Sequence, residues 1–285
     1  MKNLLLRILI MIIFLPTLWI ILFVFPVYNH LIFNLATIIV TLLAAFEVEH
    51  FFVKKQIFTW KYVSPFLGAA LPLYSFLEIS GVVGRGYFPL VIVLLISLVF
   101  VRGVFTRTEV KLESRLAFFS SSVLVIFYPG IFLSYIVRLT DKSVFGPEPQ
   151  FAILVFLSLV FCNDIMAYVG GMLFGRRYPM NLLISPKKSL VGFITGFVTS
   201  IGFSIFYTFV LKDYYVIPLA YAVILGVVIG ISTIAGDLLE SVMKRSCELK
   251  DSGTLMAGRG GLMDTIDSLL LSAPLFYFLF PLIIR

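Results

Sequence analysis

The 285-residue sequence has few charged residues, only two cysteines and only two histidines. Cys162 and Cys247 are both expected at the reducing face of a membrane, so we expect no structural disulfide. His30 and His50 lie far apart and outside the polar clusters described below. A zinc site or a Ser-His-Asp triad therefore has almost no residues from which to form. Chemistry in this chain must use carboxylates, lysines, arginines and backbone amides.

Apolar residues dominate the sequence instead. Hydrophobic residues make up 60% and charged residues 13% of the chain, and the mean hydropathy of +1.07 is far above that of a soluble domain. Apolar runs of about 20 residues, long enough to span a bilayer, recur along the whole length. We expect nine such spans, at residues 4–26, 31–53, 63–80, 87–105, 116–138, 150–174, 190–211, 214–235 and 266–284.

No soluble domain fits between these runs, so the sequence predicts an all-α, polytopic integral membrane protein. We expect one continuous membrane domain, with N-terminal transmembrane helices in residues 1–115 and a C-terminal transmembrane region in residues 116–285. The first run is too long for the apolar core of a signal peptide and has no cleavage site after it, so a retained helix is expected.

The distribution of lysine and arginine predicts a cytoplasmic N-terminus. With that orientation, 17 of the 22 basic residues fall on the cytoplasmic side and five on the other, as the positive-inside rule requires. The ratio is still 13 to 5 without the four basic residues between positions 244 and 259. The net charge of +7 thus follows mainly from topology, with some attraction to anionic lipid, and indicates no nucleic-acid partner.

A first polar cluster begins inside the sixth apolar run. Asp164 is a carboxylate within a span, which marks a functional candidate by default, although a structural hydrogen-bonding role is the alternative. Tyr168 follows four residues later and therefore lies on the same helical face. Gly170, Gly171 and Gly175 form a stripe of small residues that allows close helix packing or close approach of the backbone.

The same cluster ends in a lysine pair, Lys187 and Lys188, directly after Pro186. Pro186 fits the first turn of a new helix, whose free backbone N–H groups would lie beside the two lysines. This pattern predicts a phosphate-binding site. A positive-inside loop capped by Ser185 explains the lysines equally well.

The second polar cluster spans residues 236–268. It holds six of the 15 acidic residues in the chain: Asp237, Glu240, Glu248, Asp251, Asp264 and Asp267. If the helix of the eighth run continues past Gly236, then Asp237, Glu240 and Lys244 share one polar face, and Glu240 and Lys244 are placed to pair.

A glycine-rich loop, residues 258–261, precedes the last helix, on which Asp264 and Asp267 fall at i and i+3. Carboxylates from two helices across such a loop suit Mg²⁺ that keeps part of its coordination shell for phosphate oxygens. The alternative is a solvated juxtamembrane loop with helix-capping aspartates, which explains the paired carboxylate faces poorly.

Several of these segments resemble the phosphatidate cytidylyltransferase family, the CDP-diacylglycerol synthases. The matching motifs are Asn163-Asp164-Ile165-Met166-Ala167-Tyr168, Phe174-Gly175-Arg176, Ile184-Ser185-Pro186-Lys187-Lys188-Ser189, Ser241-Val242-Met243-Lys244-Arg245, Lys250-Asp251-Ser252-Gly253, Gly258 to Gly261 and Asp264 to Asp267. The likeness covers residues 150 to 270, and the first five spans match only in being apolar. It implies a dimeric, all-helical membrane enzyme that joins CTP to phosphatidic acid with release of pyrophosphate.

The resemblance also implies the roles of individual residues. Asp237 and Asp264 would hold Mg²⁺ with Asp267 close by, and a second cation is left open. The catalytic set is Asp237, Lys244, Lys250, Asp251, Asp264 and Asp267, and the substrate-binding set is Asp164, Tyr168, Ser185, Lys187, Lys188, Arg245 and Arg259. The expected location is the inner (cytoplasmic) membrane, with the active site facing the cytoplasm.

Three positions depart from the family pattern. Val191 stands where the family has a glutamate, Arg259 where it has a histidine, and Thr265 where it has an arginine. Arg259 offers the positive charge that Thr265 lacks. The charge would then come from a different position of the chain but serve the same chemical role.

Two other functions remain open from the sequence. A related membrane CTP-dependent lipid kinase, such as a polyprenol kinase, would need a hydroxyl nucleophile and a stronger base. A cation-coupled transporter would bind its ion at Asp164, Asp237 and Asp264. Against transport, the halves of the chain show no internal repeat, and the charges gather at one face rather than at the membrane midplane.

Overall fold

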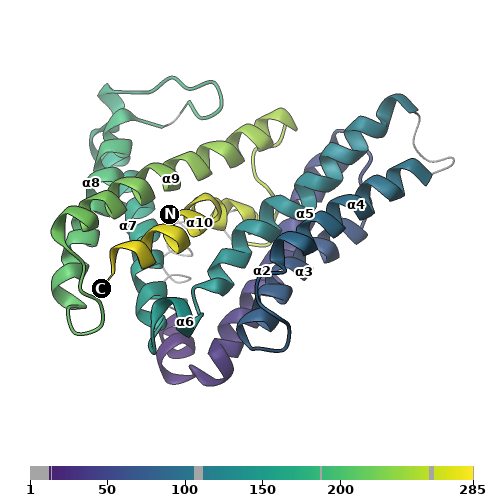
Figure 1. Ribbon diagram of the computed structural model, residues 1–285. Coiled ribbons are helices and arrows are strands. Elements are labelled where there is room, and N and C mark those ends of the chain that lie inside the picture. Colours follow the sequence, from purple (N-terminus) through teal and green to yellow (C-terminus); the bar gives the residue numbers. More distant parts are fainter. Residues whose placement is uncertain (1–12, 14, 106–111, 187, 257–259, 285) are drawn as a thin grey trace. The chain divides into compact units, whose positions relative to one another are not determined.

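The computed structural model describes residues 13, 15–105, 112–186, 188–256 and 260–284, and these form helices joined by short connections (Figure 1). The longer helices are α2 (Val27–Lys54), α3 (Val63–Ile79), α4 (Phe88–Phe105), α5 (Arg115–Arg138), α7 (Gln150–Phe174), α8 (Leu190–Val210), α9 (Leu219–Ser246) and α10 (Met263–Ile283). A four-residue helix, α6 (Lys142–Phe145), was not predicted. Within the described residues β-structure is limited to isolated bridges, which confirms the all-α prediction.

Seven helices in the described part of the chain are long and apolar enough to cross a membrane. Two further predicted spans, 4–26 and 63–80, correspond there to shorter apolar helices, Leu15–Val24 and α3. Lipid offers no hydrogen-bond partners, so an apolar segment of this length satisfies its backbone within a helix. A polytopic membrane protein is confirmed, whereas the count of nine spans and the cytoplasmic N-terminus stay predictions.

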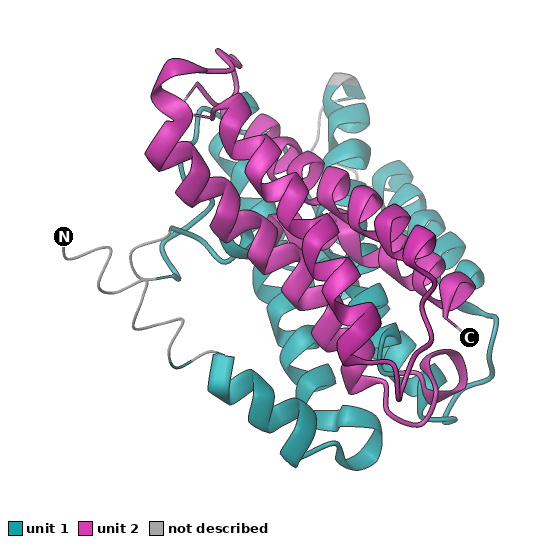
Figure 2. Cartoon of the chain, turned by 90° about the vertical axis from the view of Figure 1, so that its left-hand side faces the viewer, with its two compact units in different colours: residues 1–140, 246–265 teal, residues 141–245, 266–285 magenta. Residues whose placement is uncertain are grey.

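The chain forms two compact units, coloured separately in Figure 2. Unit 1 consists of residues 1–140 and 246–265, and unit 2 consists of residues 141–245 and 266–285. The expected division at residue 115 within one continuous domain stays a prediction.

In unit 1, α3 and α5 approach each other closely at two glycines. A Cβ atom on Gly130 would lie 2.7 Å from the carbonyl oxygen of Gly68, and one on Gly68 would lie 3.1 Å from the carbonyl oxygen of Ile126. Without a hydrophobic drive between helices in lipid, such small residues allow the backbone contact that holds helices together. Near the C-terminal ends of the same two helices, the buried Glu78 on α3 forms an ion pair with Arg138 on α5.

In unit 2, the predicted small-residue stripe lies between α7 and α8. A Cβ atom on Gly170 would lie 2.2 Å from the Thr195 hydroxyl oxygen, and one on Gly192 would lie 2.8 Å from the Ala167 carbonyl oxygen. The stripe therefore sets the close packing of these two helices, as predicted.

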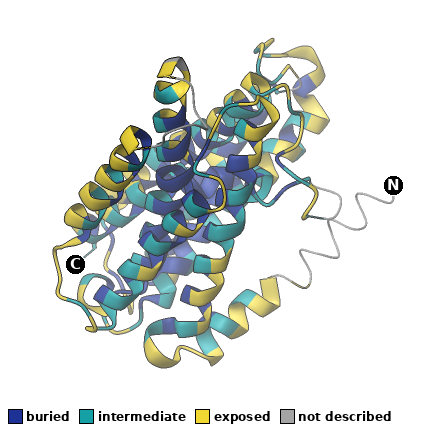
Figure 3. Cartoon of the chain, turned by 90° about the vertical axis from the view of Figure 1, so that its right-hand side faces the viewer, coloured by how far each residue is buried: buried dark blue, intermediate teal, exposed yellow. Residues whose placement is uncertain are grey.

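Exposed positions form long stretches on several helices, seen in yellow in Figure 3, and many of them are large apolar residues. On α4, only 17% of the 18-residue apolar segment is buried inside the protein. Apolar side chains exposed over a whole span are expected where the surroundings are lipid.

Candidate active site

Four carboxylates of unit 2 come from three helices. Asp164 lies on α7, Asp237 and Glu240 lie on α9, and Asp267 lies on α10. Asp267 is buried, and its carboxyl group interacts electrostatically with three other acidic residues. The interaction is strongest with Asp237, weaker with Glu240 and weakest with Asp164. We call these four residues the acidic cluster.

Backbone proximity explains how the cluster forms. A Cβ atom on Gly236 would lie only 2.6 Å from the carbonyl oxygen of Asp267, so α9 and α10 meet directly beside the acidic residues. One turn below, the hydroxyl of Ser232 donates to that of Ser272 over 2.9 Å. Residues with small or hydroxyl side chains thus bring the two carboxylate-bearing helix segments together.

Neutral side chains fix the α7 part of the cluster. The Ser268 hydroxyl donates a hydrogen bond of 3.2 Å to Oδ1 of Asp164, and the Asn163 amide donates one of 2.8 Å to the Ser200 hydroxyl. Asp164 is therefore tied to α10, and its neighbour Asn163 is tied to α8.

Two lysines partly neutralise the acidic cluster. Nζ of Lys188 lies 2.5 Å from Oδ2 of Asp237, and Lys244 pairs with the fully buried Glu240 one turn before it on α9. The pairing of Glu240 with Lys244 and the continuation of the helix past Gly236 are both as predicted. The four carboxyl groups outnumber the two ammonium groups, so the cluster offers oxygen ligands to a cation.

This donor set fits a divalent cation that a nucleotide also ligates. Mg²⁺ prefers carboxylate oxygens and usually takes one or two of them, with water and phosphate oxygens completing its shell. Within the described ranges no three Asp, Glu, His or Cys side chains are close enough to hold a metal ion by themselves. Mg²⁺ and its ligands Asp237, Asp264 and Asp267 stay predictions.

The expected helix start at Pro186 is wrong. The described residues 178–186 and 188–190 form a hairpin-like turn, called the 178–190 turn below, with isolated bridges between Pro179 and Ser189 and between Leu182 and Ser185. Helix α8 begins at Leu190, because the Ser189 side chain caps it by accepting from the backbone N–H of Gly192. A serine with extended backbone is a stronger helix start than the proline before it. Lys188 thus reaches Asp237 from a loop rather than from a helix N-terminus.

Asp264 belongs to unit 1, where it organises the segment that precedes α10. Its Oδ2 atom accepts hydrogen bonds from the backbone N–H groups of Ser252 (2.9 Å) and Gly261 (2.8 Å), and lies 2.9 Å from the Ser252 hydroxyl. Lys250 and Asp251, both exposed, lie in the same segment. Asp264 and Asp267 are one turn apart on α10, as predicted.

The remaining predicted site residues lie outside the acidic cluster. Tyr168 on α7 is exposed, and Nε of Arg245, at the end of α9, donates to the Ile184 carbonyl over 3.3 Å. Ser185 lies in the 178–190 turn. The predicted roles of Lys187 and Arg259 fall on positions outside the described residues.

Sequence reasoning did not single out Glu47 and Glu49, two buried carboxylates on α2. Glu49 accepts from the Tyr62 backbone N–H (3.2 Å) and the Thr59 hydroxyl (3.3 Å). Glu47 contacts the segment around Asp264. The signal was present, because both are acidic residues inside an apolar run, which is the feature that marked Asp164.

Comparison with other proteins gives a consistent result. The sequence matches the family model described as "Cytidylyltransferase family" over residues 5–283. It is 31% identical to the phosphatidate cytidylyltransferase of Aquifex aeolicus (strain VF5) over 159 residues, which cover 56% of each chain. It is 30% identical to the phosphatidate cytidylyltransferase of Bacillus subtilis (strain 168) over 214 residues, which cover 73% of this chain and 72% of that protein.

A third relative is the phosphatidate cytidylyltransferase of Synechocystis sp. (strain ATCC 27184 / PCC 6803 / Kazusa). The identity is 35% over 189 residues, which cover 58% of this chain and 63% of that protein. The matches thus span less than two thirds of the Aquifex and Synechocystis proteins.

Proposed function

Because the chain belongs to the cytidylyltransferase family, we propose that it joins CTP to phosphatidic acid, giving CDP-diacylglycerol and pyrophosphate. The observation that carries the proposal is the acidic cluster of Asp164, Asp237, Glu240 and Asp267, with Lys188 and Lys244 paired to two of its members. Three relatives named phosphatidate cytidylyltransferase support the choice of substrates.

The reaction needs positioning more than acid–base chemistry. A phosphate oxygen of phosphatidic acid forms a bond to the α-phosphorus of CTP, and the bond from that phosphorus to the β-phosphate oxygen breaks. The electron pair leaves with pyrophosphate. Because the attacking phosphate is already an anion near neutral pH, the site has to neutralise charge and align the two groups.

The lysines and carboxylates of the cluster divide this work. Lys188 and Lys244 are the cations that would face the phosphates of CTP and the leaving pyrophosphate, releasing Asp237 and Glu240 in part as they do so. Asp237 and Asp267 are the ligands in unit 2 that would hold Mg²⁺, which when bound supplies further neutralisation of phosphate charge. A role for Asp264 as a third ligand rests on the sequence.

The setting of the enzyme is part of the proposal. We place the chain in the cytoplasmic membrane of a bacterial cell with the acidic cluster open to cytoplasmic CTP, because basic residues concentrate on that side. Phosphatidic acid would reach the site from the bilayer, and the working form would be a homodimer.

The proposal is tested with purified protein in detergent, phosphatidic acid, CTP labelled in the α-phosphate and Mg²⁺. Label should move into a chloroform-soluble product, with one pyrophosphate released for each lipid formed. CTP labelled in the γ-phosphate is the control, and its label should stay in water. Transfer of the γ-label to a polyprenol would instead identify a lipid kinase. Absence of any transfer, with cation uptake into proteoliposomes, would identify a transporter.

A further inference from the structure

The carboxyl group of Glu47 is buried at the beginning of α10. Its Oε1 atom accepts from the backbone N–H of Leu262 and its Oε2 atom from that of Met263, each over 2.8 Å. Met263 is the first residue of α10 and Leu262 directly precedes it, so neither N–H group has an acceptor within the helix. A residue of α2, more than 200 positions earlier in the chain, therefore caps the helix that carries Asp264.

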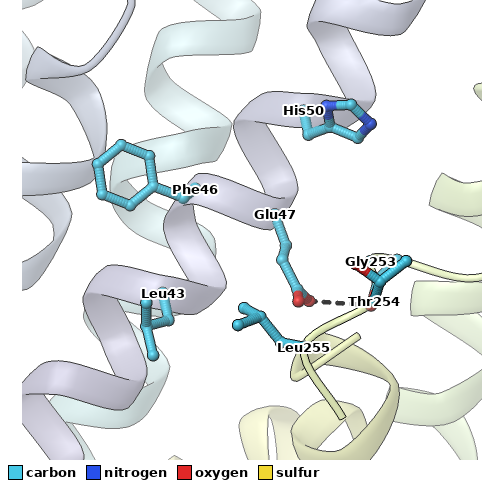
Figure 4. Close-up of a pocket in the computed structure, with 8 residues that line it drawn as sticks. Leu43, Phe46, Glu47, His50, Gly253, Thr254 and Leu255 are labelled. Carbon is cyan, nitrogen blue, oxygen red and sulfur yellow. Dashed lines mark hydrogen bonds between the residues drawn. The ribbon is translucent and has the colours of Figure 1, made fainter. Parts of the chain in front are cut away.

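Glu47 also holds the segment on the other side of Asp264. The Ser252 hydroxyl lies 2.9 Å from Oε2 of Glu47 and 2.9 Å from Oδ2 of Asp264. It has one proton to share between the two carboxylates, so Glu47 and Asp264 are linked through a single side chain. Figure 4 shows the Glu47 side chain reaching from α2 to the loop at Gly253 and Thr254.

Two glycines make room for this carboxylate. A Cβ atom on Gly253 would lie 2.6 Å from Oε1 of Glu47, and one on Gly261 would lie 2.5 Å from Oε2. Real Cβ atoms do not approach oxygen so closely, so the backbone at both positions is fitted to Glu47. Glu47 also lines one wall of a cavity of about 320 Å³ beside Leu43, Phe46 and Leu255.

We propose that Glu47 is a positioning residue for nucleotidyl transfer, which holds the first turn of α10 and Ser252 so that Asp264 keeps its orientation. This inference rests on the proposed function and adds to it a residue from the N-terminal half of the chain. Glu47 acts through backbone amides and Ser252 and does not touch the substrates. A negative charge at a helix N-terminus is favourable, and here it is held at the end of α10 by burial.

The test uses full-length Glu47→Gln, which keeps the size of the side chain but presents an amide group to N–H donors. Turnover of CTP with phosphatidic acid should fall at least tenfold, while KM for CTP changes less than threefold. Hydrogen exchange of the backbone amides of residues 260–263 should become at least tenfold faster. Glu49→Gln is the matched control, because Glu49 is equally buried on α2 but binds the 59–62 segment. It should leave both measurements within twofold.

Ser252→Ala provides a second variant that removes one hydroxyl and no charge. Its effect on turnover should not add to that of Glu47→Gln, since both break the same link. Full turnover in Glu47→Gln, or unchanged exchange at residues 260–263, would overturn the positioning role, as would strictly additive losses. A wild-type protein without transferase activity would reject the proposed function, whereas the exchange measurement would still decide whether Glu47 holds α10.

Discussion

Lys188 and Asp237 form an ion pair in which the lysine nitrogen lies 2.5 Å from a carboxylate oxygen. The side chains are 18% and 37% exposed, so water screens the pair only in part. The lysine comes from the 178–190 turn and the aspartate from α9. The pair therefore joins the proposed phosphate-binding turn of unit 2 to a predicted metal ligand, and a phosphate anion or a cation arriving there would compete for one of its two members.

Lys188→Met should lower turnover about a hundredfold, because a donor aimed at transition-state charge typically contributes that much. Lys188→Arg keeps the charge and should retain more activity. Steady-state rates at saturating Mg²⁺ check the prediction, with Lys212→Met, which removes an exposed lysine of the same unit, as control. Equal rates for Lys188→Met and the control would remove Lys188 from the site.

Asp237→Asn and Asp264→Asn should each abolish turnover while the protein still folds, since each removes one charge from a predicted Mg²⁺ ligand. An asparagine at position 264 keeps a carbonyl oxygen for the N–H groups of Ser252 and Gly261. Turnover is measured across a Mg²⁺ titration, and thermal unfolding in detergent reports on folding. Near wild-type turnover at saturating Mg²⁺ in either variant would show that the metal assignment at that residue is wrong.

Gly236→Ala should destabilise unit 2, because the added Cβ would meet the Asp267 backbone carbonyl at 2.6 Å, and backbone cannot move aside as a flexible side chain does. Overpacking of this kind typically costs about 1–3 kcal/mol. Gly202→Ala on α8 is the matched control, since nothing lies within 4 Å of its Cβ position. There the gain in helix propensity should dominate. Thermal unfolding of both variants checks this: Gly236→Ala should lower the midpoint temperature, whereas Gly202→Ala should not.

The helices were predictable because a bilayer imposes length and apolarity on every span. Predicted spans 63–80, 87–105 and 150–174 agree with α3, α4 and α7 to within one residue at each end. Helix α9 extends 11 residues beyond the predicted end of its apolar run, to Ser246, and polar periodicity rather than hydropathy revealed that extension.

The parts of the site that depend on distant contacts were not predictable in the same way. The pairing of Glu240 with Lys244 follows from helical spacing, whereas the pairing of Lys188 with Asp237 depends on how the 178–190 turn folds. The preference of proline for the first turn of a helix led to the prediction of a helix start at Pro186. In the structure Ser189 is the N-cap, and the helix begins at Leu190. Glu47 caps a helix more than 200 residues away, which no local pattern shows.

Tyr215 lies in the connection between α8 and α9 and should make the free energy of unfolding decrease as pH rises in the alkaline range. Burial and then the charge of Glu148 raise the pKa of its hydroxyl from 10.0 to about 12. A folded-state pKa above the unfolded one gives stability that is present below pH 10 and lost as pH rises from 10 to 12, at most about 3 kcal/mol.

Thermal unfolding between pH 7 and pH 11.5 checks this. Tyr215→Phe should lose about 1 kcal/mol at neutral pH, because its hydroxyl donates to the Phe145 carbonyl over 2.8 Å, and should show a flatter decline above pH 10. Tyr214→Phe, which alters the exposed neighbouring tyrosine, should keep the wild-type pH dependence. Identical alkaline declines for wild type and Tyr215→Phe would refute the assignment.

Arg259 is the residue of the predicted site that departs furthest from the family pattern, and the sequence predicts that its guanidinium takes the place of the arginine that Thr265 replaces. Arginine offers a fork of donors suited to phosphate oxygens, which neither histidine nor threonine matches. Arg259→Ala should therefore lower CTP-dependent turnover by about a hundredfold, on the order of a few kcal/mol of transition-state stabilisation.

Adding Thr265→Arg to the Arg259→Ala variant should restore part of that loss, since the two positions are only six residues apart in the sequence. The Thr265 hydroxyl is shielded from solvent and makes no hydrogen bond within the described residues, so the longer side chain has to extend past its neighbours toward the anion. Thr265→Arg alone measures the cost of that accommodation. Unchanged kinetics in Arg259→Ala, or a double variant no faster than the single one, would mean that Arg259 is a positive-inside residue facing water, because only a phosphate-binding arginine is replaceable from position 265.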